Sequence, residues 1–159
     1  MAYDAHDDGR RDFHFLYGRW AVQHRRLTAR GVGAKEWDSF EGSSFTQGLM
    51  GGLCNVEEND FPDRGFQGVA FRSFDVEQQR WSIHWVSSTD GLVQPPVHGR
   101  FEGVVGLFLG DDVDGDRPVR VRFRWDEITP ASARWTQAFS YDGGETWEEN
   151  WVMRFTRTA

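Results

Sequence analysis

The sequence has little of several features that identify common classes of protein. Its single cysteine, Cys54, excludes an internal disulfide and fits a reducing compartment. No apolar run approaches the length of a membrane span, and no charged and then apolar leader opens the chain. The net charge of -7 argues against a nucleic-acid binder, because such proteins present a basic face to phosphates. We therefore expect a cytoplasmic protein with neither a nucleic-acid nor a membrane partner.

Motifs of well-known active sites and metal sites are also missing. The sequence has no Gly-x-Ser-x-Gly elbow, no phosphate loop and no dinucleotide fingerprint. Its histidines lie on separate predicted elements and form no close ligand pair: His6, His14, His24, His84 and His98. The acidic residues 111–116 lack the glutamate at the twelfth position of a calcium loop and are most simply a solvated turn. The sequence thus predicts no metal and no cofactor.

Aromatic residues and glycines are abundant, with 8 Trp, 13 Phe and 18 Gly, whereas Pro is rare at 5. Large aromatic side chains suit pleated, half-buried surfaces, and glycines supply the turns between strands. A chain of 159 residues is long enough for one domain with a sizeable core. We expect a flexible acidic N-terminus over 1–12 and a single β domain over 13–159.

Hydrophobic alternation with a period of two runs through most of the chain and indicates β-strands. The last hairpin is the clearest case: Asp142-Gly143-Gly144 predicts a tight turn, and the apolar residues after it alternate with polar ones. Similar strands are predicted from Arg19 onward and over 35–46, 53–59, 65–75, 80–88, 97–102, 104–109, 117–127, 135–140 and 147–157. About ten short strands without a long helix favour a single antiparallel up-and-down barrel, with one helical turn before Gly18.

Gly18-Arg19-Trp20 opens the first strand directly after a short aromatic turn. This segment resembles the Gly-x-Trp signature of the lipocalin-like (calycin) barrels. The pattern from Phe13 to Trp20 and from Asn150 to Phe155 is similar to small lipocalin-like domains of bacteria. The resemblance covers nearly the whole chain and implies a barrel with a cavity. It also implies that Trp20 packs over the closed end against a basic side chain, either Arg154 or Arg157.

Residues 140–147 have the pattern Ser-x-Asp-x-Gly-x-Thr-Trp, which is similar to the Asp-box hairpin of sialidase-type propellers. Those proteins carry the motif several times, and this chain carries it once. We interpret it as a device that stabilises a turn and assign it no catalytic role.

The more apolar face of each predicted strand is expected to line the lumen. This places Trp20, Val22, His24 and Arg26 inside on the first strand. An aromatic lining with a few polar groups is typical of a small-molecule pocket. The residues predicted to bind a ligand are Trp20, Arg26, Asn55, Trp85, Trp135, Gln137, Trp151 and Met153.

Three polar residues on the predicted lumen face, His24, Glu57 and Glu149, are candidates for acid–base catalysis if the protein is an enzyme. A histidine beside a carboxylate would form such a couple. Arg26 is expected to pair with Glu57 or Glu149, because a buried charge needs a partner. For each residue singly, a solvated position at the barrel mouth is the simpler interpretation.

The arginines at 120, 122 and 124 alternate with Val121, Phe123 and Trp125. Three like charges on one strand face favour a solvated outer row. If that face pointed inward, the row would instead line an anion site.

These features favour a protein that binds a small hydrophobic or aromatic molecule in an aromatic-lined cavity. The alternative is a cofactor-independent enzyme, of cyclase, isomerase or hydratase type, that acts on such a molecule in the same cavity. A homodimer formed through exposed aromatic residues, such as Trp37 or Phe101, is a third possibility.

Overall fold

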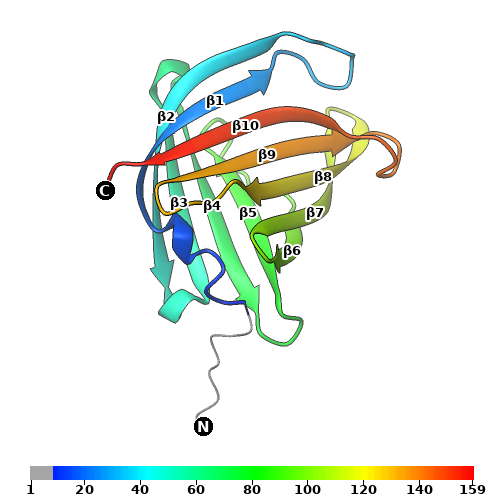
Figure 1. Cartoon of the computed structure of the whole chain (residues 1–159). Helices are drawn as coiled ribbons and strands as arrows, with labels where there is room; N and C mark the ends of the chain where they lie inside the picture. Colours follow the sequence, from blue (N-terminus) through cyan, green and yellow to red (C-terminus); the bar gives the residue numbers. More distant parts are fainter. Residues whose placement is uncertain (1–8) are drawn as a thin grey trace.

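The computed structural model describes residues 9–159 and shows an all-β protein (Figure 1). Its strands form one closed barrel in the order β1-β10-β9-β8-β7-β6-β5-β4-β3-β2. Each strand is antiparallel to its neighbours in the sequence, and β1 closes the barrel against β10. The predicted up-and-down barrel with a short N-terminal helical turn is therefore confirmed. Within the described residues, no helix is long and apolar enough to cross a membrane.

The strands are β1 (Gly18–Leu27), β2 (Trp37–Leu49), β3 (Cys54–Phe61), β4 (Phe66–Asp75), β5 (Arg80–Ser87), β6 (Val97–Glu102), β7 (Val105–Asp114), β8 (Arg117–Asp126), β9 (Ser132–Ser140) and β10 (Glu148–Arg157). Three short 3-10 turns accompany them: η2 (His14–Leu16), η3 (Met50–Gly52) and η4 (Pro62–Arg64).

The period of two in the sequence separates the core from the surface. In β1, the side chains of Trp20, Val22 and His24 are buried, whereas the alternate residues Ala21 and Gln23 are exposed. Adjacent side chains of a strand point to opposite faces of the sheet, so one face of each strand fills the barrel. The predicted inward face of the first strand is confirmed for these three residues.

One end of the barrel is closed by η2 and by Trp20. The Trp20 indole donates to the Leu16 carbonyl at 2.8 Å, and Arg157 lies over the indole ring at 4.1 Å. The Arg157 guanidinium also donates to the carbonyls of Phe15 and Tyr17, both at 2.6 Å. Arg157 is thus the basic side chain expected against Trp20. The other candidate, Arg154, lies outside the barrel.

The residues before η2 also contact this end of the barrel. The amide of Asp12 donates to the Gly9 carbonyl at 3.0 Å, and the same carbonyl accepts the Trp81 indole N–H at 3.2 Å. Residues 9–12 of the predicted flexible N-terminus therefore form a turn on the barrel. Residues 1–8 of that predicted segment lie outside the described residues.

The β9–β10 connection at the opposite end has the geometry expected of a turn-stabilising motif. Asp142 accepts the backbone N–H and the hydroxyl of Thr146, and the Ser140 hydroxyl accepts the Gly144 N–H at 2.8 Å. These hydrogen bonds favour the carboxylate and lower the pKa of Asp142 to about 2. The motif fixes the turn that leads into β10.

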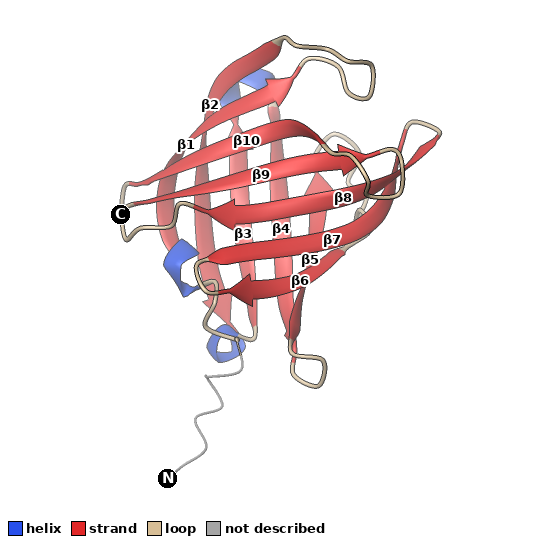
Figure 2. Cartoon of the chain, turned by 45° about the vertical axis from the view of Figure 1, so that its right-hand side comes forward, coloured by secondary structure: helices blue, strands red, loops and turns tan. Residues whose placement is uncertain are grey.

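The barrel wall is incomplete where β6 begins. β5 pairs with β6 over three residue pairs only, and the pairing of β6 with β7 ends at His98 and Leu109. Pro95 and Pro96 precede β6 and have no N–H to donate to a ladder. β7 nevertheless continues to Asp114, past the start of β6 (Figure 2). The short pairing of β6 leaves a notch in the wall at the open end. The length of β7 also corrects our expectation that residues 111–116 form only a turn.

The three arginines of β8 form an outer row, as predicted. Arg120 pairs with Asp111 at 2.9 Å, Arg124 pairs with Asp126 at 2.8 Å, and Arg122 lies over the Trp147 ring. The alternate residues of β8, among them Val121 and Trp125, are buried. The row therefore lies on the outer face of the barrel, where it pairs with the exposed Asp111 and the covered Asp126, and the alternative of an internal anion site at these arginines is wrong.

Candidate functional site

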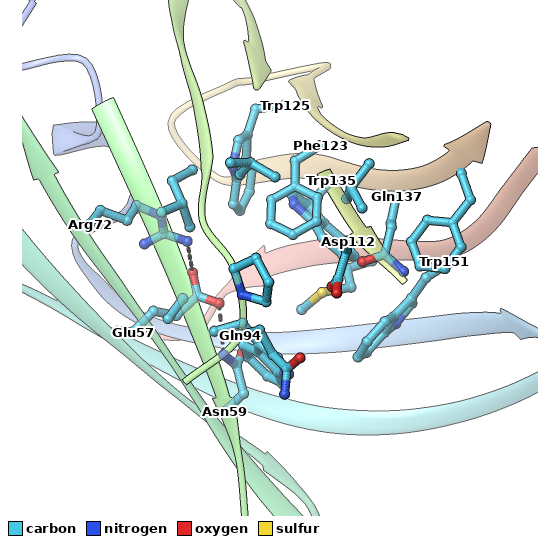
Figure 3. A pocket seen from close by; sticks show the side chains of 18 of the residues that line it. Glu57, Asn59, Arg72, Gln94, Asp112, Phe123, Trp125, Trp135, Gln137 and Trp151 are labelled. Atoms are coloured by element: carbon cyan, nitrogen blue, oxygen red, sulfur yellow. Dashed lines mark hydrogen bonds and ion pairs between the residues drawn. The ribbon is translucent and has the colours of Figure 1, made fainter. Parts of the chain in front are cut away.

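The lumen contains a cavity between the closed end and the notch. Its volume is about 100 Å³, counted as the space that the centre of a water molecule can occupy. Figure 3 shows its two unlike walls. Polar side chains of β3 and β4 line one wall, and aromatic side chains of β8, β9 and β10 line the other.

The polar wall is built around Arg72 of β4. Its guanidinium donates to a Glu57 carboxylate oxygen at 2.6 Å and to the Asn55 side-chain oxygen at 2.8 Å. Asn59 donates to the other Glu57 oxygen at 2.8 Å. Residues 55, 57 and 59 alternate along β3 and therefore point to the same face, and Asn55 lies directly opposite Arg72 in the β3–β4 register.

Both charges of this wall are buried, with Arg72 3% and Glu57 4% exposed. Burial of an ion is costly unless a partner of opposite charge and further hydrogen bonds compensate it. Here each Glu57 oxygen has a donor, and the guanidinium also lies over the rings of Phe13 and Trp125, at 4.8 and 5.8 Å. The pair is thus held in a fixed geometry on the side of the cavity.

Three buried polar atoms on the cavity lining have no hydrogen-bond partner within residues 9–159. They are the Arg72 Nε, the Trp125 Nε1 and the Asn59 Oδ1. The first two are donors and the third is an acceptor. Buried polar groups in folded proteins are satisfied in the large majority of cases, by protein, water or ligand. These atoms are covered by neighbouring side chains, so a ligand in the cavity would reach them only after those side chains moved.

The opposite wall consists of aromatic rings in edge-to-face contact. Trp135 is T-shaped to Phe123 at 5.0 Å and to Trp151 at 5.6 Å, and Trp85 is T-shaped to Trp151 at 6.3 Å. Such contacts fix the rings relative to one another, with the edge of one ring against the face of its neighbour. Met153 of β10 adds an adaptable side chain to the same lining.

His24 positions one of these rings. The Trp151 indole donates to the His24 Nδ1 at 3.1 Å, and the imidazole stacks on Phe40 with a centroid distance of 4.8 Å. Burial, and next the positive charge of Arg26, lower the pKa of His24 to about 4. The ring is therefore neutral at pH 7, and its Nδ1 accepts. The expected couple with a carboxylate is not formed, because the partner of His24 is Trp151.

Arg26 does not pair with either predicted carboxylate. Its guanidinium lies over the Trp151 ring at 4.3 Å, while Glu57 pairs with Arg72. Burial, followed by the charge of Arg30, lowers the pKa of Arg26. Arg26 lines an open vestibule at the mouth on the far side of Trp151 from the cavity. The predicted ion pair is wrong, and Trp151 separates Arg26 from the lumen.

Glu149 lies outside the barrel rather than in the lumen. A β-bulge between Glu149 and Trp151 places an extra residue in β10, and this shifts the alternation that the sequence suggests. Asn150 is buried at 2% exposure and accepts a hydrogen bond from Gln137 at 2.8 Å. The prediction that Glu149 faces inward is therefore wrong, and the three acid–base candidates do not converge on one site.

Five of the predicted ligand-binding residues line the cavity: Trp85, Trp135, Gln137, Trp151 and Met153. Asn55 is buried behind them as a partner of Arg72, and Trp20 belongs to the closed end. Our reading of the sequence missed Arg72, Asn59 and Trp125. The alternation of β4 between Gly68, Ala70 and Arg72 contained the signal for Arg72, because all three lie on one buried face.

The notch forms the entrance to the cavity. Gln94 and Pro95 line it on the side of β5, and Asp111 and Asp112 line it on the side of β7. Asp111 turns outward to Arg120. Asp112 follows the inward face of β7, two residues after the buried Gly110, and Figure 3 shows it beside Gln137 above the aromatic wall.

The remaining candidates for interaction sites lie elsewhere. Phe101 packs against Phe13 and Phe108 in the core, and Trp37 is half-buried under the Arg25 guanidinium. Over residues 9–159, no group of three His, Cys, Asp or Glu side chains is arranged to hold a metal ion. Comparison with known proteins found no family model and no curated protein that matches the chain.

Proposed function

We propose that this barrel binds one small, flat, apolar or aromatic molecule in its lumen. The observation that carries the proposal is the pairing, across one cavity, of an aromatic wall with a polar wall that still has unpartnered atoms. Small-molecule sites have this make-up, with a mostly apolar lining and a few polar groups that fix orientation. The unpartnered atoms lie on the Arg72, Trp125 and Asn59 side chains.

The size of the cavity limits the size of the ligand. A volume of about 100 Å³ is below the roughly 300–1,000 Å³ of pockets for drug-sized molecules. Because a cavity of roughly 150 Å³ holds one benzene ring, a single ring is the upper limit for this lumen, and a short side chain on that ring would extend into the entrance.

Binding is favoured over the enzymatic alternative by the arrangement of the polar groups. His24 is neutral and engaged with Trp151, Glu57 is engaged with Arg72 and Asn59, and Glu149 is outside. A cyclase, isomerase or hydratase would need an acid or base within reach of its substrate. His24, Glu57 and Glu149 do not together place a free acid or base beside a substrate in the lumen.

A fluorescence titration tests the proposal. Trp125, Trp135 and Trp151 line the cavity, so a bound ring should change the tryptophan emission and give a saturable curve. For a single-ring probe such as 2-phenylethanol, we expect a Kd on the order of 0.1–1 mM.

The matched variants are Val121→Phe and Val69→Phe. Val121 lines the cavity, whereas Val69 lies on the outer face of β4 at 36% exposure. Val121→Phe should fill the lumen and abolish saturable binding, and Val69→Phe should leave the curve unchanged. Equal binding by wild type and Val121→Phe would place the probe outside the lumen and refute the proposal.

A further inference from the structure

Asp112 differs from the other carboxylates that contact the lumen. Glu57 has a cationic partner in Arg72, and Asp111 has one in Arg120. The Asp112 side chain accepts only the N–H of Val113, at 2.8 Å, and has no cationic partner within residues 9–159. A charged group that faces a cavity without a counter-charge is available to a ligand.

The placement of Asp112 follows from the backbone. It lies opposite Val119, a buried residue of β8, and on the same face of β7 as the buried Phe108 and Gly110. β6 begins at Val97 and pairs with β7 only as far as Leu109, so the following residues of β7 have no paired strand on that side. The carboxylate is therefore half-buried at the entrance and lines the same cavity as Trp135 and Trp151 (Figure 3).

A carboxylate beside several aromatic faces is the combination that recognises organic cations. The face of an aromatic ring carries negative charge density, so a Trp ring attracts a positive group above it. Trp135 and Trp151 supply such faces, and Asp112 supplies a full negative charge and hydrogen-bond acceptors. The deeper charges of Arg72 and Glu57 neutralise each other and do not oppose a cation at the entrance.

We infer that the ligand is a small arylalkyl amine, with its ring in the lumen and its ammonium group at Asp112. This inference rests on the proposed function, since it names the chemical class of the molecule that the lumen would bind.

The competing feature is the arginine-rich vestibule. Arg26 and Arg30 lie over Trp151 and Phe139, at 4.3 and 5.2 Å. These guanidiniums would attract an anionic ligand at the mouth. However, neither of them lines the cavity, whereas Asp112 does. The test must therefore distinguish binding of an arylalkyl amine from binding of an aromatic carboxylate.

The test uses three probes with similar shapes: 2-phenylethylamine, 2-phenylethanol and 3-phenylpropionate. Their Kd values are measured at pH 7 and low ionic strength by tryptophan fluorescence and confirmed by isothermal titration calorimetry. We expect the amine to bind about tenfold more tightly than the alcohol, because it adds a charge-assisted hydrogen bond. This advantage should shrink at high salt, since a half-exposed charge pair is screened.

Asp112→Asn is the critical variant and Asp111→Asn is its control. Both remove one negative charge from neighbouring positions at the entrance, but the Asp111 carboxylate is paired with Arg120, whereas Asp112 has no cationic partner within residues 9–159. Asp112→Asn should lower the affinity for the amine to that for the alcohol and leave the alcohol unaffected. Asp111→Asn should retain the preference for the amine. Circular dichroism of both variants checks that the barrel is folded.

Three outcomes would overturn the inference. Equal binding of alcohol and amine by wild type would refute the cation site while leaving lumen binding intact. Preference for 3-phenylpropionate would assign the polar end of the ligand to the arginine vestibule instead. Binding of none of the three probes up to about 10 mM would overturn both the inference and the proposed function.

Discussion

Replacing Arg72 by methionine is the most informative single perturbation of the polar wall. Met matches the aliphatic part of the Arg side chain but cannot donate hydrogen bonds or carry charge. Arg72→Met would leave Glu57, which is 4% exposed, with Asn59 as its remaining donor. Breaking a buried ion pair by removal of one partner costs about 3–5 kcal/mol. For a chain of this size, that corresponds to a decrease in Tm of roughly 6–20 °C.

The free energy of unfolding is measured by urea denaturation, followed by circular dichroism and tryptophan fluorescence. The control is Arg154→Met, which breaks an exposed pair between Arg154 and Glu127 with side-chain exposures of 60% and 54%. Exposed pairs contribute about 0–1 kcal/mol, so this variant should unfold close to wild type. If Arg72→Met is no less stable than Arg154→Met, the claim of a tightly coupled buried pair is wrong.

A double variant separates loss of the pair from loss of packing. In Glu57→Met/Arg72→Met, neither charge remains, and two apolar side chains occupy the wall. Because the main cost of the single variant is an uncompensated buried carboxylate, the double variant should be more stable than Arg72→Met. Additive losses of stability would show instead that the two residues act independently.

Two further predictions concern the mouth and the closed end. The pKa of His24 is about 4 in the fold against 6.5 when unperturbed, so the unfolded chain binds a proton first as the pH falls. The stability contributed by neutral His24 is complete above pH 6.5 and is lost between about pH 6.5 and 4, by a total of about 3 kcal/mol. Urea titrations across this range should show a flatter pH dependence for His24→Phe than for wild type, and parallel curves would contradict the assignment. Arg157→Met removes the donors to Phe15, Tyr17 and Pro130 and should destabilise the barrel by about 2–3 kcal/mol. Hydrogen exchange should accelerate in η2 above all, and unchanged protection of residues 13–17 would show that Arg157 does not hold the closed end.

Much of the barrel could be predicted because its strands and turns are encoded by local sequence patterns. Alternation in β1 and β10, glycine-rich turns, and Gly18-Arg19-Trp20 at the start of β1 each correspond to a feature of the fold. These features depend on neighbours in the sequence. The resemblance to lipocalin-like barrels left both Arg154 and Arg157 as the basic partner of Trp20, and the structure shows that the partner is Arg157.

The candidate site was predicted less well because it depends on contacts between distant strands. A one-residue bulge at Asn150 places Glu149 on the outer face instead of the predicted lumen face. No local sequence pattern predicts this bulge. Glu57 pairs with Arg72 rather than with Arg26 because of the register between β3 and β4. That register is set when the two strands pair and cannot be read from either strand alone. The inward position of Asp112 depends on the continuation of β7 beyond β6, in a segment whose acidic composition suggested a turn.

The most direct test of lumen binding is a crystal structure of the protein grown or soaked with 2-phenylethylamine. The proposed binding site predicts density for the ring between Trp135, Trp151 and the Arg72–Glu57 pair, with the amine nitrogen within hydrogen-bond distance of Asp112. Density for the ring in the lumen but away from Asp112 would retain the binding site and refute the cation site. A lumen that contains only water while the probe occupies the outer surface would contradict the central claim.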